Sequence, residues 1–224
     1  MSNASQEHGD DNARRGFSKL DPDFVLPTHA TAEDYWSWPE DVRAEVIDGV
    51  VYPKYVDEQG MAAAPLNVHQ DVVLEFASVI LPALRRTECR PYIAPFAVQL
   101  DENSTRTVEP DITVICDPAM LRERGCVGGP PWVIEVLSPT TTRTDQVVKR
   151  AAYEKAGVEE YWVVDPAGRI VYISVLGTDG VYGGTTIHAA PEVIAPRRFP
   201  ELTFDLEQIF SVLDRDGESR QRDC

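Results

Sequence analysis

The element that decides the fold class is the run Trp132-Val-Ile-Glu-Val-Leu-Ser-Pro139, residues 132–139. Its apolar residues are continuous and strand-forming, which predicts a central strand covered on both faces. Glu135 lies in the middle of this run, where an ionised carboxylate is costly unless it is paired, hydrogen-bonded or bound to a metal. The run therefore predicts a buried sheet with a functional acid inside it.

Helices and further strands surround this run. A capped helix is expected from Thr31 to Trp36, and two β-rich runs flank Asp48-Gly49, which favours a hairpin. Apolar residues repeat at intervals of three and four over residues 66–86, which predicts an amphipathic helix, and a second helix is expected over residues 145–156. Further strands are expected at residues 92–100, 110–116, 131–137, 160–164, 169–176 and 181–188, and a closing helix at residues 205–213. We therefore predict an α/β (α+β) fold in which a mixed β-sheet is flanked by helices, with an N-terminal β-hairpin.

The length of 224 residues and an ordinary globular composition predict one domain. Residues 1–24 are polar and are expected to form a disordered leader, residues 25–212 the single domain, and residues 213–224 a flexible tail. The scattered cysteines, Cys89, Cys116, Cys126 and Cys224, show neither a disulfide framework nor zinc spacing, so reduced thiols are expected. No apolar run resembles a membrane span or a signal peptide, so we expect a cytoplasmic protein without a membrane partner.

Two more acids stand at strand positions beside the predicted core. Asp111 heads the apolar run Ile-Thr-Val-Ile, and Glu45 opens the predicted hairpin. Three carboxylates around one point would raise one another's pKa unless a divalent cation neutralised them, and an all-oxygen ligand set favours Mg²⁺ or Mn²⁺. The plainer alternative for each acid alone is a strand end at the solvent rim or an ion pair with arginine.

The helix that follows the Glu135 strand carries further polar groups. Asp145, Lys149 and Tyr153 are spaced by four and share one helical face. Because this helix follows the strand directly, Lys149 can project back over the strand end, where a cation would hold a phosphate or orient an attacking water. The alternative is a surface ion pair between Asp145 and Lys149.

Six segments of the chain together resemble a known family: AEDYWSWPED with AEVIDGVVY, VHQDVVLEF, VEPDITVICDP, PPWVIEVLSPTTTRTDQVVKRAAYEKAGVEEYWVVDP and FPELTFDLEQIF. The resemblance is to the Uma-type restriction endonucleases, within the PD-(D/E)XK nuclease superfamily. It covers about residues 29–212 and implies a restriction-endonuclease-like core. It also implies metal-dependent hydrolysis of phosphodiester bonds.

Carried over to this sequence, the resemblance implies that Asp111 and Glu135 bind the metal and that Glu45 completes the site. The superfamily pattern expects lysine two residues after Glu135, where this chain has Leu137. The resemblance therefore implies a migrated lysine, and Lys149 is the candidate, since Lys155 lies on another helical face. Six further residues are expected to support the site or touch the substrate: His69, Gln99, Arg143, Asp145, Arg150 and Tyr153. For His69, a polar residue at a helix start is the alternative.

The formal net charge of −16 constrains how such a protein meets nucleic acid. Residues 1–24 hold five acids and three bases and residues 201–224 hold seven acids and three bases, so the remaining chain still carries −10. A broad basic surface is excluded, because phosphate neutralisation by lysine and arginine dominates that kind of affinity. We expect weak, salt-sensitive binding through a small cationic rim of Arg143, Lys149 and Arg150.

The function that the resemblance implies is that of a Mg²⁺-dependent endonuclease acting on DNA. Two alternatives stay open: a non-catalytic interaction or scaffold module that keeps the fold and the acids, and a metal-dependent nuclease or hydrolase acting on another nucleic acid or phosphoester. A homodimer is expected, because cutting both strands benefits from two-fold symmetry.

Overall fold

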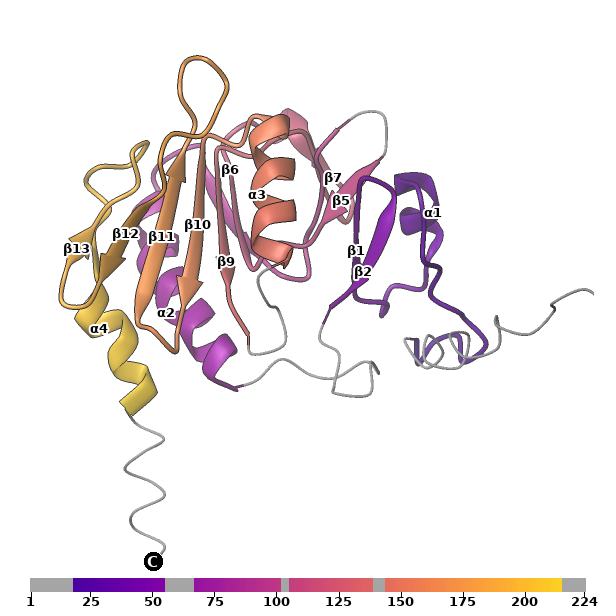
Figure 1. Cartoon of the computed structure of the whole chain (residues 1–224), viewed down its shortest axis with the longest axis horizontal. Coiled ribbons are helices and arrows are strands. Elements are labelled where there is room, and N and C mark those ends of the chain that lie inside the picture. Colours follow the sequence, from indigo (N-terminus) through magenta and orange to yellow (C-terminus); the bar gives the residue numbers. More distant parts are fainter. Residues whose placement is uncertain (1–17, 55–66, 102–104, 139–143, 215–224) are drawn as a thin grey trace, which may run out of the picture.

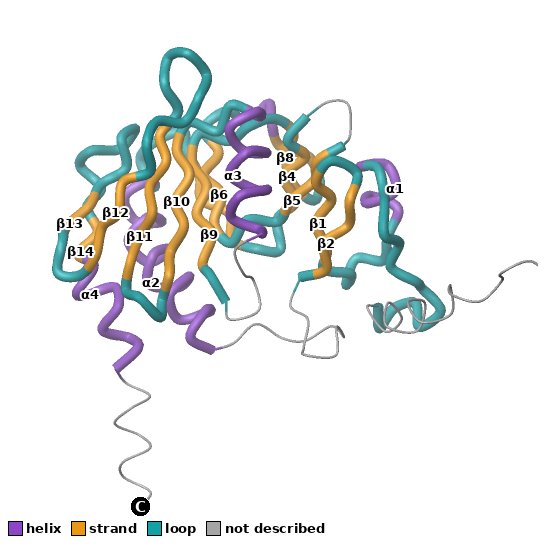
Figure 2. Tube along the Cα trace, viewed as in Figure 1, coloured by secondary structure: helices purple, strands orange, loops and turns teal. Residues whose placement is uncertain are grey.

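The computed structural model describes residues 18–54, 67–101, 105–138 and 144–214, with only the backbone of residues 144–146. Two six-stranded sheets form its core, together with a small two-stranded sheet (Figures 1 and 2). The first sheet has the order β2-β1-β5-β4-β8-β7 and the second the order β12-β11-β10-β9-β6-β3, while β13 pairs with β14. The predicted mixed α/β architecture is confirmed, although its strands divide into two large sheets.

The elements are short and have the following bounds. The first sheet contains β1 (Ala44–Ile47), β2 (Val50–Pro53), β4 (Ala97–Gln99), β5 (Arg106–Val108), β7 (Leu121–Arg122) and β8 (Gly125–Val127). The second contains β3 (Arg90–Ile93), β6 (Ile112–Ile115), β9 (Trp132–Val136), β10 (Glu160–Asp165), β11 (Ile170–Val175) and β12 (Thr186–Ala189). The small sheet pairs β13 (Val193–Ile194) with β14 (Phe204–Asp205), and the helices are α1 (Ala32–Ser37), α2 (Asn67–Leu84), α3 (Thr144–Ala156) and α4 (Leu206–Phe210), with 3-10 turns η1 (Pro118–Met120) and η2 (Ser211–Asp214).

The helices cover three different faces of the sheets. Helices α2 and α4 pack on one face of the second sheet, α3 lies where the two sheets meet, and α1 covers the outer face of the first sheet (Figure 1). Alternation along β9 places Trp132 and Ile134 in the α2 core and Val133 in the α3 core. Glu135 has the parity of Val133, so its side chain points to the space between the sheets.

Local sequence signals explain most boundaries. Thr31 caps α1 and exchanges hydrogen bonds with Asp34 in a capping box, as its sequence predicts. The β1–β2 hairpin turns at Asp48 and Gly49, whose φ angles of 50° and 81° suit the tight turn that Asp-Gly favours. Helix α3 ends before Gly157, which has φ 78°. The strand predicted at residues 92–100 is two strands, β3 and β4, which belong to different sheets.

The start of the described chain packs on the domain. Ser18 Oγ donates to Asp41 Oδ1 at 2.8 Å, and the ring of Phe24 meets Trp38 edge-on at 6.2 Å. Ser18 and Phe24, assigned to the leader from its composition, therefore pack against the folded domain. Of the predicted tail, residues 213–224, the first two belong to η2 (Ser211–Asp214), and residues 215–224 lie outside the described residues.

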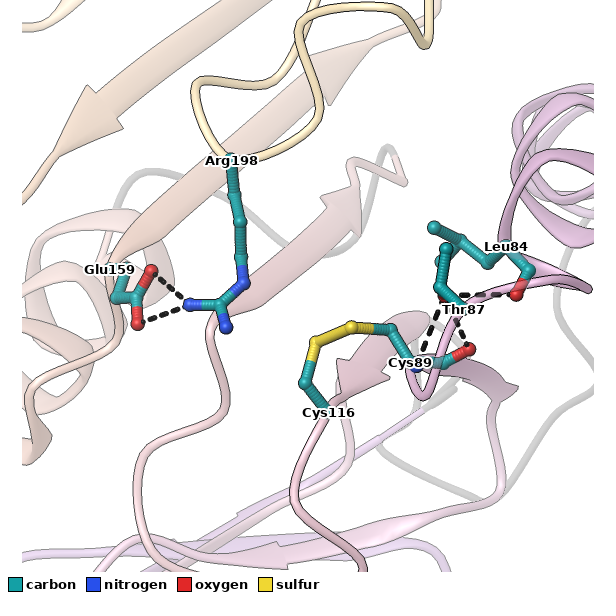
Figure 3. The surroundings of a disulfide bond; sticks show 6 residues. All are labelled: Leu84, Thr87, Cys89, Cys116, Glu159 and Arg198. Atoms are coloured by element: carbon teal, nitrogen blue, oxygen red, sulfur yellow. Dashed lines mark hydrogen bonds and ion pairs between the residues drawn. A yellow bond between two sulfur atoms is a disulfide. The ribbon is translucent and has the colours of Figure 1, made fainter.

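Cys89 and Cys116 form a disulfide, which corrects the expectation of reduced thiols throughout (Figure 3). The pair is a consequence of the sheet: β3 and β6 are antiparallel with Arg90 opposite Ile115, so the two cysteines just beyond this pair are neighbours. The two cysteines are 27 positions apart in the sequence, and no local pattern predicts the pair. Cys126 is a buried free thiol.

Candidate active site

The two sheets bring the three predicted acids to one place. Glu45 comes from β1, Glu135 from β9, and Asp111 directly precedes β6, the antiparallel neighbour of β9. All three are buried, with exposed fractions of 2%, 7% and 3% for Glu45, Glu135 and Asp111. The prediction that these acids lie beside the core is confirmed, and the alternative of a solvent rim is wrong for each of them.

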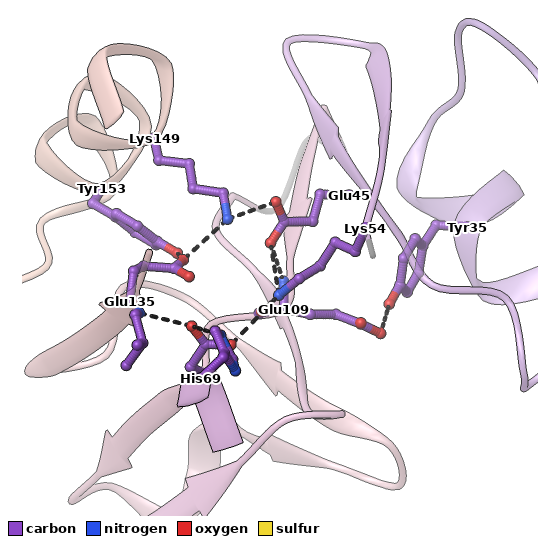
Figure 4. A network of polar contacts seen from close by, with 10 residues as sticks. Tyr35, Glu45, Lys54, His69, Glu109, Glu135, Lys149 and Tyr153 are labelled. Atoms are coloured by element: carbon purple, nitrogen blue, oxygen red, sulfur yellow. Dashed lines mark hydrogen bonds and ion pairs between the residues drawn. The ribbon is translucent and has the colours of Figure 1, made fainter. Parts of the chain in front are cut away.

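Lys149 joins two of these acids. Its Nζ lies 2.7 Å from Glu45 Oε2 and 3.2 Å from Glu135 Oε1, and the lysine is only 6% exposed (Figure 4). One turn later on α3, Tyr153 donates from its hydroxyl to Glu135 Oε1 at 2.6 Å. The prediction that Lys149 and Tyr153 share one helical face is confirmed, because both contact Glu135 Oε1.

Asp111 is held by two donors and a second lysine. His69 Nε2, from α2, lies 3.2 Å from Asp111 Oδ2, and the backbone N–H of Val136 donates to the same oxygen at 2.8 Å. Lys54 Nζ lies 3.9 Å from Asp111 Oδ1 and 3.8 Å from Glu45 Oε1. His69 is 4% exposed and contacts Asp111, so it is not merely a polar residue at the start of a helix.

Lys54 is the site residue that sequence reasoning missed. It follows β2 by one position, is 8% exposed, and also donates to the backbone carbonyl of Glu109. The only available signal was its position at the far end of the hairpin that Glu45 opens, where antiparallel pairing brings Ala44 opposite Pro53. We call the set Glu45, Asp111, Glu135, Lys54 and Lys149 the carboxylate–lysine cluster.

The acids of the cluster differ in their affinity for protons. Burial raises the pKa of Glu135, and with the nearby charges of Asp111 and Glu45 it reaches about 7 in spite of Lys149 and Lys54. Burial acts in the same sense on Asp111, but the Lys54 charge, the His69 contact and the Val136 N–H outweigh it and hold the pKa at about 2. Asp111 is therefore ionised at neutral pH, whereas Glu135 gains or loses its proton near neutral pH.

The two lysines stay charged. Burial disfavours the charge of Lys149, but the attraction of Glu135 and Glu45 is larger and moves its pKa well above the usual value. The same balance raises the pKa of Lys54, through Glu45 and Asp111. Three acids and two permanent cations thus share one buried space, and Glu135 is the group whose charge changes with pH near neutrality.

The arrangement bears directly on metal binding. Within the described residues, no three histidine, cysteine, aspartate or glutamate side chains are grouped closely enough to hold a metal ion. The contacts explain this, because ammonium groups lie between Glu45 and each of the other two acids. Asp111 and Glu135 are linked more directly, since Asp111 accepts from the residue that follows Glu135. Their carboxylates have the donor chemistry that Mg²⁺ and Mn²⁺ take, so this pair fits a divalent cation.

The other predicted site residues lie elsewhere or outside the description. Gln99 accepts from Trp36 Nε1 at 3.2 Å and donates to the Asp101 carbonyl, on the α1 side of the first sheet. Arg150 stacks over the ring of Tyr182 at 5.2 Å and donates to the Gly183 carbonyl. Arg143 and the side chain of Asp145 lie outside the described residues.

Lys149 and Arg150 do not form the expected cationic rim, and its third member, Arg143, lies outside the described residues. Lys149 is buried in ion pairs with two acids, and Arg150 is directed toward Tyr182 and Gly183. The physical reason is packing: α3 sits against both sheets, so the face that carries Lys149 meets carboxylates and not solvent.

Comparison with known proteins now identifies the family. The family model described as "Uma2: Putative restriction endonuclease" matches residues 32–207. The chain belongs to the Uma2 family. The matched region of this Uma2 protein includes every residue of the carboxylate–lysine cluster.

A solved structure shares the fold of this Uma2 protein. It is titled as a crystal structure of "a putative nuclease belonging to DUF820" from Anabaena variabilis, with a TM-score of 0.66 and 21% sequence identity. The alignment covers 81% of this chain and 98% of that one. No curated protein matches the sequence. Family membership and the shared fold together support a nuclease.

None of the helices in the described part of the chain has the length and apolar character that a membrane span requires.

Proposed function

We propose that this chain is a divalent-metal-dependent endonuclease that hydrolyses DNA phosphodiester bonds, with Mg²⁺ or Mn²⁺ as the cofactor. The observation that carries the proposal is the carboxylate–lysine cluster, in which five ionisable side chains are each at least nine-tenths buried. Buried ion pairs add little to fold stability, because desolvation costs about as much as the attraction returns. Strongly shifted pKa values in such a group favour a functional site.

Asp111 and Glu135 would hold the cation, as hard oxygen donors from the residue before β6 and from β9, its neighbouring strand. The chemistry that a divalent cation would supply there is polarisation of the scissile phosphate and acidification of the attacking water. His69 and the Val136 N–H fix the orientation of Asp111, and Tyr153 fixes that of Glu135. Glu45, predicted as a third ligand, acts in this proposal mainly by positioning Lys149, to which it is 2.7 Å distant.

Lys149 takes the role of the migrated lysine. Its ammonium group is held between Glu45 and Glu135, so positive charge is already in place where negative charge develops on the phosphate. Lys54 supplies a second positive charge from the Asp111 side of the cluster. Neither lysine adds a broad basic surface, so DNA binding should be weak and should fall as salt is raised.

The direct test is cleavage of plasmid DNA, single-stranded DNA and RNA with Mg²⁺ or Mn²⁺ at low ionic strength. Wild type should cut DNA, and Asp111→Asn and Glu135→Gln should abolish cutting. Glu201→Gln is the matched control, because Glu201 is an exposed acid distant in sequence from the cluster. Cleavage that persists in both cluster variants would show that another protein or another site is responsible.

Calorimetry with Mn²⁺ tests the metal separately from turnover. Wild type and Glu201→Gln should bind Mn²⁺, and Asp111→Asn should not. A preference for RNA over DNA would replace the proposed substrate while leaving the metal site in place.

A non-catalytic binding module is the second candidate. The observation that favours it is that the two lysines already neutralise much of the acidic charge in the described structure. Intact nucleic acid under all metals, together with no Mn²⁺ binding, would support this candidate over the nuclease.

A further inference from the structure

A cavity of about 280 Å³ opens on the α1 side of the first sheet. Its walls include Tyr35 and Trp36 from α1, Trp38 just after it, Glu109 after β5, and Arg124 from the turn between β7 and β8. The volume is near the lower end of the ~300–1,000 Å³ range of small-molecule sites, so it suits one ring system better than an extended ligand.

The aromatic side chains of this cavity are fixed in place. The ring of Tyr35 meets Trp36 at 5.2 Å and Trp38 at 5.3 Å between centroids. Trp36 donates its Nε1–H to Gln99, and the guanidinium of Arg124 lies 5.6 Å from the Trp36 ring centroid while donating to the Trp36 carbonyl. A half-buried tryptophan with a cation beside it offers a preformed stacking surface.

Glu109 joins this cavity to the carboxylate–lysine cluster (Figure 4). Its side chain accepts the Tyr35 hydroxyl at 2.7 Å and lines the cavity. Its backbone N–H donates to Glu45 Oε1 at 2.9 Å, and its carbonyl accepts from Lys54. One residue thus separates the aromatic cavity from Glu45 and Lys54 of the carboxylate–lysine cluster.

We propose that this cavity binds the nucleobase of a nucleotide adjacent to the cleaved phosphodiester bond. The inference rests on the proposed nuclease function. Every nucleobase offers a π-face to Trp36, and the N–H groups on its edge can donate to the Glu109 carboxylate. Arg124 lies beside Trp36, and its Nη1 is 3.5 Å from Glu40 Oε1 in an exposed ion pair. Its guanidinium would exchange this solvated partner for the phosphate of the same strand. The recognised class is therefore a base with its own phosphate, presented by single-stranded or locally unpaired nucleic acid.

The test measures binding without turnover, so that it does not depend on cleavage. Metal-free protein is titrated calorimetrically with the deoxynucleoside 5′-monophosphates and, as the control ligand, with 2-deoxyribose 5-phosphate. The monophosphates should bind and the sugar phosphate should bind much more weakly. Equal binding of the sugar phosphate, or no monophosphate binding up to millimolar concentration, would overturn the inference without any variant.

Two substitutions locate the binding. Trp36→Leu should weaken monophosphate binding roughly 5- to 150-fold, the range expected for the loss of one stacking partner. Arg124→Gln should also weaken it, while Arg122→Gln, an exposed arginine on the adjacent strand β7, should leave it unchanged. Wild-type affinity in both Trp36→Leu and Arg124→Gln would place the base elsewhere.

Cleavage separates failure of this inference from failure of the proposed function. If the chain is a nuclease, Trp36→Leu should raise KM for a single-stranded oligonucleotide more than it lowers kcat. Cleavage with an unaltered KM would refute the base site and leave the nuclease intact. Monophosphate binding by a protein that cuts nothing would refute the nuclease and leave the binding pocket.

Discussion

Replacing Lys149 with methionine tests how the carboxylate–lysine cluster is balanced. Methionine keeps an unbranched side chain, one heavy atom shorter than that of lysine, and removes the cation that lies 2.7 Å from Glu45 and 3.2 Å from Glu135. Removing one partner of a buried ion pair typically costs about 3–5 kcal/mol, because the other charge stays buried without compensation. Here the cost should depend on pH, since Glu135 can take up a proton.

The sign follows from the pKa of Glu135, which burial already raises to about 7. Without Lys149 this pKa rises further, so above pH 7 the folded variant holds a proton that folded wild type has released. The unfolded chains hold none, and the variant therefore loses stability relative to wild type by about 1.4 kcal/mol per pH unit. Because wild-type Glu135 is still half protonated at pH 7, the difference in unfolding free energy should grow by about 2.3 kcal/mol between pH 7 and pH 9, until the new pKa is passed.

The assay is urea denaturation in a chelating buffer at pH 6, 7, 8 and 9, followed by the fluorescence of the buried Trp132 and Trp162. Lys155→Met is the matched control, because Lys155 is exposed on the same helix and carries the same charge. Combining Lys149→Met with Glu135→Gln should remove the pH dependence. A destabilisation that is constant from pH 7 to pH 9, or that Lys155→Met reproduces, would refute this account.

Three further predictions follow from single side chains. Lys54→Met should lower kcat for DNA cleavage by about 10²–10³-fold, the usual cost of losing a group that stabilises developing charge. Lys155→Met should cleave at the wild-type rate, and equal rates in the two variants would exclude Lys54 from the reaction. Burial raises the pKa of Glu109, so its negative charge lowers the free energy of unfolding above the ordinary glutamate pKa near 4.5. Glu109→Gln should therefore resist urea better than wild type at pH 7.5 and equally well at pH 4, and a higher stability at pH 4 alone would contradict this sign. Phe76, fully buried against Trp162 and Phe204, should cost about 3–5 kcal/mol of unfolding free energy when changed to alanine, whereas Leu74→Ala, at a position 64% exposed on the same helix, should cost much less.

Local patterns were sufficient for much of the architecture. The apolar repeat of α2, the Asp-Gly turn between β1 and β2, and the continuous apolar run of β9 each express a preference that nearby residues satisfy by themselves. The sequence also predicts the three acids, because burying a carboxylate inside an apolar strand is costly whichever strand it pairs with. Sequence alone therefore determined the class of fold, the three buried acids of the carboxylate–lysine cluster and the helical face of Lys149.

Tertiary structure decided what those groups face. Lys54 joins the cluster only because β2 pairs with β1, and Lys149 is buried only because α3 packs where the two sheets meet. Cys89 meets Cys116 through the register of β3 on β6. Glu109 links the cavity to the cluster because it contacts Glu45, 64 positions earlier in the chain, and Tyr35, 74 positions earlier. Such pairings have no local signature, because the residues come together through strand pairing and helix packing between distant segments. Whether an ammonium group meets solvent or a carboxylate is set by that packing, and with it the charge balance of the site.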